Sequence, residues 1–361
     1  MYKNLVKTSL FLLNLPPFLY LSSFLLFFSL PLYPAPLKAK PKTILVTGGA
    51  GFIGSHVNKD LCDAGYQTII LDNLYRGSRE AVYKAIFIEG DFGNAHLLDQ
   101  IFKDYLIDAV MHFGGLKDVG ESTQEPIRYY STNVGSTLVL LEAMLRHEVK
   151  IFVFSSSAAI FGQPLMENIT EEHPCNPINP YGHSKLMIET ILKDLDKAYG
   201  LRYSCLRYFN AAGGDPDGVI KNHQLKNSNL IPIILRSLEE PNGHVTVFGM
   251  DHKTFDGTCI RDYIHVKDIS AAHITVMEKL FNGEHSQNYN LGNGKGFSVN
   301  EVIDTIEKVT GRKINVTASS RREGDPPKLI ASSQKAKNEL GWEPYFPSLE
   351  TMVEHAWQAM P

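Results

Sequence analysis

The stretch VTGGAGFIGSH, residues 46–56, constrains the fold of this chain more than any other feature. It places Gly48, Gly51 and Gly54 in a G-x-x-G-x-x-G spacing, between a short apolar run and a segment with helical periodicity. Glycine at such a turn lets the backbone come close to a pyrophosphate, whose charge is then held by N–H groups at the helix start. A turn that only packs helix against strand is the alternative. The flanking strand and helix favour the first βαβ unit of a dinucleotide-binding fold.

Compact apolar runs alternate with helical periodicity from residue 42 to residue 210. The runs are residues 43–48, 67–73, 85–91, 107–113, 150–156 and 202–208, and the helical segments are residues 52–65, 94–105, 126–147 and 180–199. Strands that are apolar on both faces and alternate with helices imply a parallel sheet with helices on both sides. We therefore predict an α/β chain with a Rossmann-type doubly wound parallel sheet.

An acid ends the second predicted strand, where dinucleotide-binding folds hold a ribose. Asp72 follows the glycine turn by the expected interval of about 20 residues. A carboxylate there suits a ribose 2′-hydroxyl and repels a 2′-phosphate, which favours NAD over NADP. The nearby Arg76 mildly favours NADP instead. Asp91, after the third strand, is either a contact for the adenine end of the cofactor or a solvated loop acid.

The pattern changes after Asn210. The stretch GGDPDG, residues 213–218, is rich in turn residues, and shorter helices and strands follow it. We predict that residues 42–210 form mainly the NAD-binding Rossmann domain. Residues 211–361 are predicted to form mainly a smaller C-terminal α/β lobe that binds substrate, with some chain returning to the sheet.

Residues 1–40 have a different composition. Lys3 and Lys7 precede a long apolar run that Pro16 and Pro17 interrupt, and its uninterrupted part, residues 18–30, has the length of a signal-peptide core. Three interpretations stay open, namely a cleaved signal, a membrane anchor, and a start-site extension that is never made. Membrane contact is expected only through this segment.

Charge and cysteine content narrow the functional class. A formal net charge of −4 does not predict binding to nucleic acid. Cys62, Cys175, Cys205 and Cys259 show neither C-x-x-C nor another metal-ligand spacing. We therefore predict no metal site, and a reducing compartment is the simpler expectation.

The stretch NPYGHSK, residues 179–185, places Tyr181 and Lys185 four positions apart on one face of a predicted helix. A free phenol has a pKa of about 10 and is a poor base at neutral pH. A nearby ammonium, together with the positive charge of an oxidised nicotinamide, would lower that pKa. Without further context, such a pair is common on the surfaces of helices and indicates no function. Here FSSSAAIFG precedes it at the carboxyl end of a strand, where parallel sheets bind ligands and a serine can bridge the tyrosine and the substrate.

A series of stretches resembles the extended short-chain dehydrogenase/reductase superfamily and, within it, the UDP-glucose 4-epimerase family. The stretches occur in family order from Lys42 to about Trp357 and are VTGGAGFIGSH, LDNL, EGD, HFGGLKDVGES, YYSTNVGST, FSSSAAIFG, NPYGHSK, LRYFNAAG, GTCIRDYIHVKD, YNLGNG and RREGDPP. The resemblance implies tightly bound NAD and a UDP-hexose substrate. It also implies a homodimer formed through the helix that contains Tyr181 and a neighbouring helix.

The resemblance also implies roles for individual residues. The catalytic group matches Ser157, Tyr181 and Lys185. The positions that match the NAD site are Gly48, Gly51, Phe52, Ile53, Gly54, Asp72, Asn73, Asp91, Phe92, Phe113, Lys117, Asn133, Tyr181, Lys185 and Phe209. The positions that match the UDP-sugar site are Ser157, Tyr181, Asn210, Asn229, Phe248, Arg261, Arg322 and Asp325.

The reaction implied is reversible 4-epimerisation of UDP-glucose and UDP-galactose through a transient 4-keto sugar. Leu329, intermediate in size at a position that limits N-acetylated sugars in the family, keeps UDP-GlcNAc and UDP-xylose/UDP-arabinose exchange open. A sugar-nucleotide dehydratase is disfavoured because residues 155–159, SSSAA, carry no acid. A non-catalytic NAD-binding protein would have no need of the three catalytic residues together. The supply of NAD and UDP-sugars favours a cytoplasmic catalytic domain.

Overall fold

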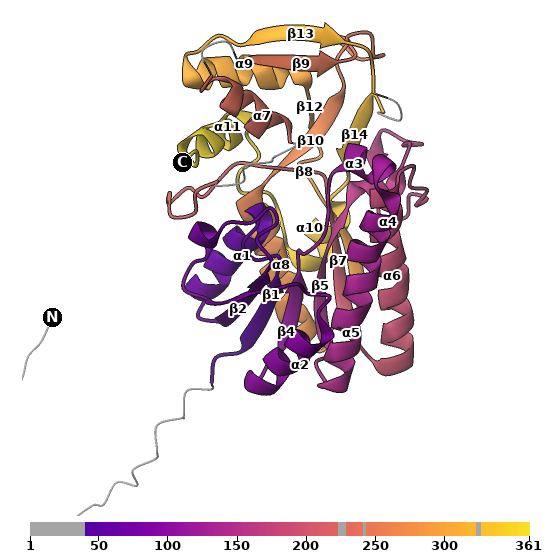
Figure 1. Ribbon diagram of the computed structural model, residues 1–361. Coiled ribbons are helices and arrows are strands. Elements are labelled where there is room, and N and C mark those ends of the chain that lie inside the picture. The colour runs from indigo at the N-terminus through magenta and orange to yellow at the C-terminus, as the bar shows by residue number, and fades with distance from the viewer. Residues whose placement is uncertain (1–39, 223–228, 241–242, 323–325) are drawn as a thin grey trace, which may run out of the picture. The chain divides into compact units, whose positions relative to one another are not determined.

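The computed structural model describes residues 40–222, 229–240, 243–322 and 326–361 (Figure 1). Residues 41–361 form one compact unit. The apolar segment before it lies outside the described residues, so its three interpretations stay predictions. Within the described ranges, no helix is both long and apolar enough to cross a membrane.

A seven-stranded, wholly parallel sheet forms the centre of the larger half of the molecule. Its strands, in spatial order, are β11 (Gln287–Leu291), β7 (Arg202–Tyr208), β5 (Ile151–Ser157), β4 (Ala109–His112), β1 (Thr43–Thr47), β2 (Gln67–Asp72) and β3 (Ile86–Glu89). In chain order, the strands first extend the sheet from β1 through β2 to β3 on one side. They then extend it from β4 through β5 and β7 to β11 on the other side. This reversal creates a crevice at the carboxyl ends of β1 and β4, where such sheets bind ligands.

Helices cover both faces of this sheet, which confirms the predicted doubly wound class. They are α1 (Phe52–Asp63), α2 (Ala95–Asp104), α3 (Val119–Gln124), α4 (Pro126–Tyr129), α5 (Ser136–Arg146), α6 (Pro180–Tyr199), α8 (Val266–Phe281) and α10 (Gln334–Leu340). Side chains of β1 alternate between two cores, with Ile44 and Val46 facing α1 and α8, and Leu45 facing α2, α5 and α6. Both faces are therefore buried, as the apolar strands require.

Shorter elements form the second half, seen in the upper part of Figure 1. The strands are β6 (Asn168–Ile169), β8 (Asn210–Ala212), β10 (Ile260–His265), β12 (Gly296–Ser298) and β14 (Lys328–Ala331), with β9 (His244–Phe248) and β13 (Asn315–Ser319) as a separate parallel pair. The helices α7 (Leu230–Ser237), α9 (Val299–Thr310) and α11 (Leu349–Gln358) share one apolar core with this half. Three later elements, α8, β11 and α10, return to the large sheet.

One helix differs from its predicted form. The segment predicted as a single helix over residues 126–147 contains a π-helical stretch, Tyr130–Gly135, between α4 and α5. Within it, the buried amide of Asn133 accepts from the Leu116 N–H at 2.7 Å and donates to the Ser184 hydroxyl at 3.0 Å. Tertiary bonds of this kind widen a helix locally and are frequent near functional sites. Helix α3 has no counterpart among the predicted elements.

Candidate active site

The glycine turn between β1 and α1 leaves no room for side chains. Gly48 has a φ of +70°, and a Cβ there would lie 2.5 Å from the Gly114 nitrogen. A Cβ at Gly54 would lie 2.4 Å from the Gly48 carbonyl oxygen. No side chain caps the first turn of α1, so its backbone N–H groups face the crevice. The turn has the shape and polarity of a pyrophosphate cradle.

Two acids lie beside this turn, at the ends of β2 and β3. Buried Asp72 accepts from the N–H groups of Ala50 and Leu74, at 3.0 Å and 2.8 Å. Burial raises the pKa of Asp72, and these two hydrogen bonds oppose the rise. Asp91 accepts from the Asn73 amide at 3.0 Å. The structure thus brings together the sequence-predicted residues for the adenosine end of NAD.

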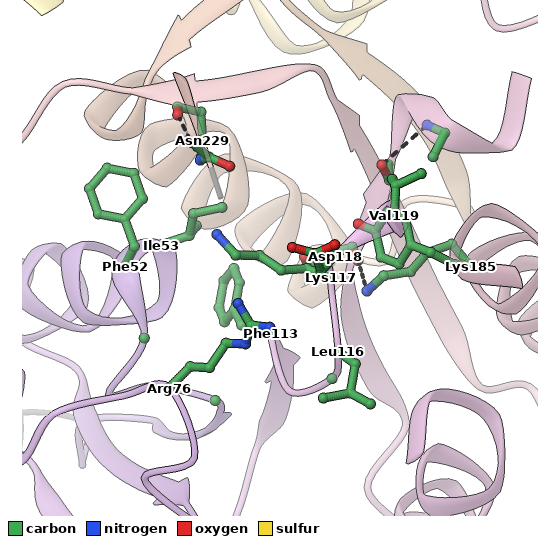
Figure 2. A pocket seen from close by; sticks show the side chains of 18 of the residues that line it. Phe52, Ile53, Arg76, Phe113, Leu116, Lys117, Asp118, Val119, Lys185 and Asn229 are labelled. Atoms are coloured by element: carbon green, nitrogen blue, oxygen red, sulfur yellow. Dashed lines mark hydrogen bonds between the residues drawn. The ribbon is translucent and has the colours of Figure 1, made fainter. Parts of the chain in front are cut away.

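Lys117 extends into the pocket from the loop after β4, as Figure 2 shows. Burial lowers the pKa of Lys117 to about 8, and the charge of Arg76 adds to the effect. The backbone next to this lysine is fixed, because the Asn133 amide bonds both the N–H and the carbonyl of Leu116. Lys117 is partly buried, and an ammonium in such a position facing a cavity is a strong attractor for a phosphate or other anion.

Helix α6 carries the tyrosine and the lysine. It begins at Pro180, behind an Asn179 side chain that accepts from the Gly182 N–H at 2.8 Å. A Cβ at Gly182 would lie 2.5 Å from the Ala159 carbonyl oxygen, so the first turn of α6 packs directly on the backbone that follows β5. This contact places Tyr181 against the end of β5 and its serines.

Tyr181 and Lys185 lie together at the end of β5. Burial raises the pKa of Tyr181, and an interaction with the Ser157 hydroxyl opposes the rise. Lys185 Nζ donates to the Ser155 carbonyl oxygen at 2.8 Å and lies 5.9 Å from the centroid of the tyrosine ring. Burial also lowers the pKa of Lys185, to about 8. The predicted lowering of the pKa of Tyr181 depends on the charge of an oxidised nicotinamide as well as on Lys185, and it stays a prediction.

A single cavity of about 1110 Å³ joins the glycine turn, the catalytic group and the smaller half. This exceeds the ~300–1,000 Å³ of common ligand pockets, as a site for two ligands requires. The predicted substrate residues that line it are Asn210, Asn229, Arg261 and Arg322, together with Leu329, which was predicted to limit the size of the sugar. The structure therefore places most of the predicted cofactor and substrate residues around one space.

Two predicted site residues do not line the cavity, and a third is not among the described residues. Asn133 does not line the cavity, because both ends of its amide hold neighbouring protein groups. Phe248 stands behind the lining, with the Arg322 guanidinium 4.0 Å above its ring. Asp325 lies outside the described residues.

Another lining residue, Tyr208, was not predicted, whereas Ser155 was one of three serines considered as the bridge between the tyrosine and the substrate. Tyr208 is buried at the end of β7, and its hydroxyl is hydrogen-bonded to the Ser155 hydroxyl. In the sequence, Tyr208 ends an apolar run and has the pattern of a core residue. Among the described residues, no group of histidine, cysteine, aspartate and glutamate side chains is arranged to hold a metal ion.

Comparison with known proteins establishes the family. The model of the NAD dependent epimerase/dehydratase family matches residues 44–292. This chain belongs to that family.

Several known proteins are similar to this chain over most of its length. The UDP-glucose 4-epimerase of Halalkalibacterium halodurans is 52% identical over 87% of this chain and 94% of the relative. Crystal structures of UDP-glucose 4-epimerases are also similar. The Brucella ovis protein in complex with NAD has a TM-score of 0.85 and 41% identity, over 88% of this chain and 97% of that one. The Bifidobacterium longum protein in complex with NAD+ and UDP has a TM-score of 0.84 and 38% identity, over 88% and 98%. The resemblance identified in the sequence is thus confirmed.

Proposed function

We propose that this chain is an NAD-dependent enzyme that interconverts UDP-glucose and UDP-galactose by inverting carbon 4 of the hexose. The observation that carries the proposal is the single cavity in which Tyr181, Ser157 and Lys185 lie between the glycine turn and the arginines of the smaller half. Inverting a carbon requires its C–H bond to be broken and remade on the other face. At a carbon whose C–H bond no neighbouring carbonyl acidifies, a redox cofactor beside a proton acceptor provides that without a second substrate.

The residues present fit NAD. Gly48 and Gly54 leave space where the pyrophosphate would lie, and Asp72 would bind the adenosine ribose. The Lys117 and Lys185 ammonium groups would contact the phosphate and nicotinamide ribose parts of the cofactor. When bound, NAD supplies a reversible hydride acceptor.

Side chains of this protein accept and return the proton of the 4-hydroxyl group. Tyr181 is positioned to take the proton of the 4-hydroxyl while the sugar becomes a 4-keto intermediate, and to return it after the ring has turned. Ser157 interacts with Tyr181, which opposes the rise in the pKa of Tyr181, and it would hold the same sugar oxygen. Lys185, anchored on the Ser155 carbonyl, places a positive charge behind the phenol. This charge favours the phenolate once the oxidised nicotinamide adds its own charge.

The smaller half would hold the UDP portion. Arg261 and Arg322 line the cavity there, and guanidinium groups bind phosphate oxygens in a bidentate manner. Asn210 is fixed by donating to the Asp262 carbonyl at 3.0 Å. Anchoring the part that does not react keeps the keto sugar in the site while its ring turns.

Purified protein that begins near Lys40, mixed with UDP-galactose, tests the proposal. Formation of UDP-glucose without added NAD is the expected result, because the cofactor is regenerated in each cycle. A 4-keto-6-deoxy product would indicate a dehydratase instead. No turnover, with NAD still present in the protein, would indicate a binding protein.

We also propose a homodimer that is formed through α5 and α6. The apolar side chains of Leu138 on α5 and Met187 on α6 are 41% and 45% exposed, which supports a contact on these helices. Sedimentation equilibrium should give twice the chain mass. A cytosolic location of the catalytic unit is proposed from the supply of its cofactor and substrate.

A further inference from the structure

The end of β5 is joined to helix α6 at several points. Lys185 is hydrogen-bonded to the Ser155 carbonyl oxygen, and Tyr181 interacts with Ser157, as described above. One helical turn beyond Lys185, on the same face of α6, stands Glu189. Tyr181, Lys185 and Glu189 are spaced four residues apart, so one face of the helix carries all three contacts with the strand.

Glu189 makes the third contact, with the serine between the other two. Ser156 Oγ donates to Glu189 Oε1 at 2.5 Å, and both side chains are buried. Because side chains alternate along a strand, Ser156 points with Phe152 and Phe154 to the face that α6 covers. The two catalytic contacts lie on either side of this bond.

Arg207 completes a closed network around Glu189. It lies on β7 directly opposite Ser156 in the parallel register. Its Nε donates to Glu189 Oε1 at 3.0 Å and its Nη2 donates to Oε2 at 2.6 Å. Both side chains are 5% exposed. Two buried charges are costly unless every polar atom is paired, so this network has one favourable geometry.

We propose that Glu189, held by Ser156 and Arg207, is a positioning residue for the epimerase reaction. The inference rests on the function proposed above. Glu189 fixes the position of α6 along β5 and thereby sets where the Tyr181 hydroxyl and the Lys185 ammonium lie. A shift of one residue along a helix moves a side chain by about 1.5 Å. A misplacement of roughly 1 Å can lower a rate by about 100-fold.

The network also acts on the charge of Lys185. The titratable and charged groups around Lys185 are Glu189 and Tyr181 on its own helix, Cys205, Arg207 and Tyr208 on β7, and His112 on β4. Cys205 and the carboxylate of Glu189 both raise the pKa of Lys185 against the effect of burial. Without the carboxylate, this ammonium would lose its proton at a lower pH. The alkaline limb of the rate profile would then move to lower pH.

The test uses the NAD-containing protein and two matched serine variants. Ser156→Ala removes one bond to Glu189. Ser204→Ala is the control, because Ser204 is equally buried on β7 and its hydroxyl donates only to the Gln287 carbonyl. We expect Ser156→Ala to lower kcat for UDP-galactose about 5- to 20-fold, with KM within about twofold, by the misplacement argument. The control should keep the wild-type kcat.

Glu189→Gln tests the electrostatic part, because the amide keeps the shape and loses the charge. Its kcat is expected to fall by about 10- to 100-fold, and the alkaline limb of kcat should move to lower pH. Unfolding temperature and bound NAD are measured for each variant. The inference is overturned if the two serine substitutions lower the unfolding temperature by the same amount and neither changes kcat or the alkaline limb of the rate profile. The network would then be only structural.

If Glu189→Gln does not fold, the comparison of Ser156→Ala with Ser204→Ala still tests whether the network positions α6. Wild-type protein in the same assay separates the two proposals. An active wild type with unaffected variants overturns the positioning role alone. A wild type that contains NAD but does not convert UDP-galactose overturns the proposed function and, with it, this inference.

Discussion

The two walls of the cavity are built differently. On the wall formed by β5 and α6, Lys185 is 5% exposed and hydrogen-bonded to backbone, and Tyr181 lies in the same pocket lining as Ser157. On the wall of the smaller half, Arg322 is exposed and lies over an aromatic ring, and Leu329 is half-buried. The first wall is preorganised for chemistry, whereas the second is open to adjustment when a ligand binds. Variants on the first wall should therefore change kcat, and variants on the second should change KM or substrate preference.

Tyr181→Phe should have the largest effect. Removing the hydroxyl takes away the proton acceptor, which contributes about 10²- to 10⁴-fold in general acid–base catalysis. Turnover of UDP-galactose should fall by that factor while the bound NAD content stays at the wild-type level. Retained turnover within about tenfold would mean that another group accepts the proton.

Lys185→Met should reduce kcat by about 100-fold, because the substitution removes the charge behind the phenol, which also lies over the Phe154 ring, and keeps a side chain of similar length. The rate profile checks the cause. Since the pKa of Lys185 is lowered to about 8, the wild-type kcat should decline as pH rises through that region, and the variant should lack this decline. The prediction is wrong if both proteins show the same alkaline decline.

Arg261→Gln on the opposite wall should raise KM for UDP-galactose by about 10- to 100-fold and leave kcat within about threefold, because a charge-assisted contact contributes about 1.5–3 kcal/mol. Initial rates over a range of substrate concentrations separate the two constants. Arg202→Gln is a suitable control, since Arg202 starts β7 at the end far from the cavity. A fall in kcat with unchanged KM would contradict the division between the walls.

Leu329→Ala should have the smallest effect on UDP-galactose turnover, because the residue only borders the cavity. The space gained should raise kcat/KM for UDP-GalNAc relative to UDP-galactose by up to about tenfold, which is the lower limit for one methylene group in a pocket. Competition between the two substrates in one reaction measures the ratio directly. An unchanged ratio would show that Leu329 does not limit the sugar size.

Local signals in the sequence predicted the catalytic wall well. Helix α6 has its predicted ends because Asn179 caps it, Pro180 occupies its first position and Gly200 ends it with a φ of +65°. Strand β7 likewise coincides with the apolar run at residues 202–208. Such elements are determined by residues near in sequence, so their pattern is readable without the tertiary structure.

Features that depend on distant contacts were not predictable. The π-helical stretch exists because Asn133 bonds Leu116 and Ser184, which adjoin it only in the fold. The pKa of Tyr181 likewise follows from burial, which its neighbours in sequence do not reveal. In the smaller half, β8 and β12 are three residues each and are set by their pairing with β10.

The central claim is that Tyr181 becomes a base only beside an oxidised nicotinamide. Ultraviolet titration of tyrosinate tests it most directly, comparing protein with bound NAD+, the same protein after chemical reduction of the bound cofactor, and Tyr181→Phe. The account predicts one ionisation that is absent from the variant and that occurs at a clearly lower pH in the oxidised protein than in the reduced one. An ionisation of Tyr181 at the same pH in both redox states would contradict it.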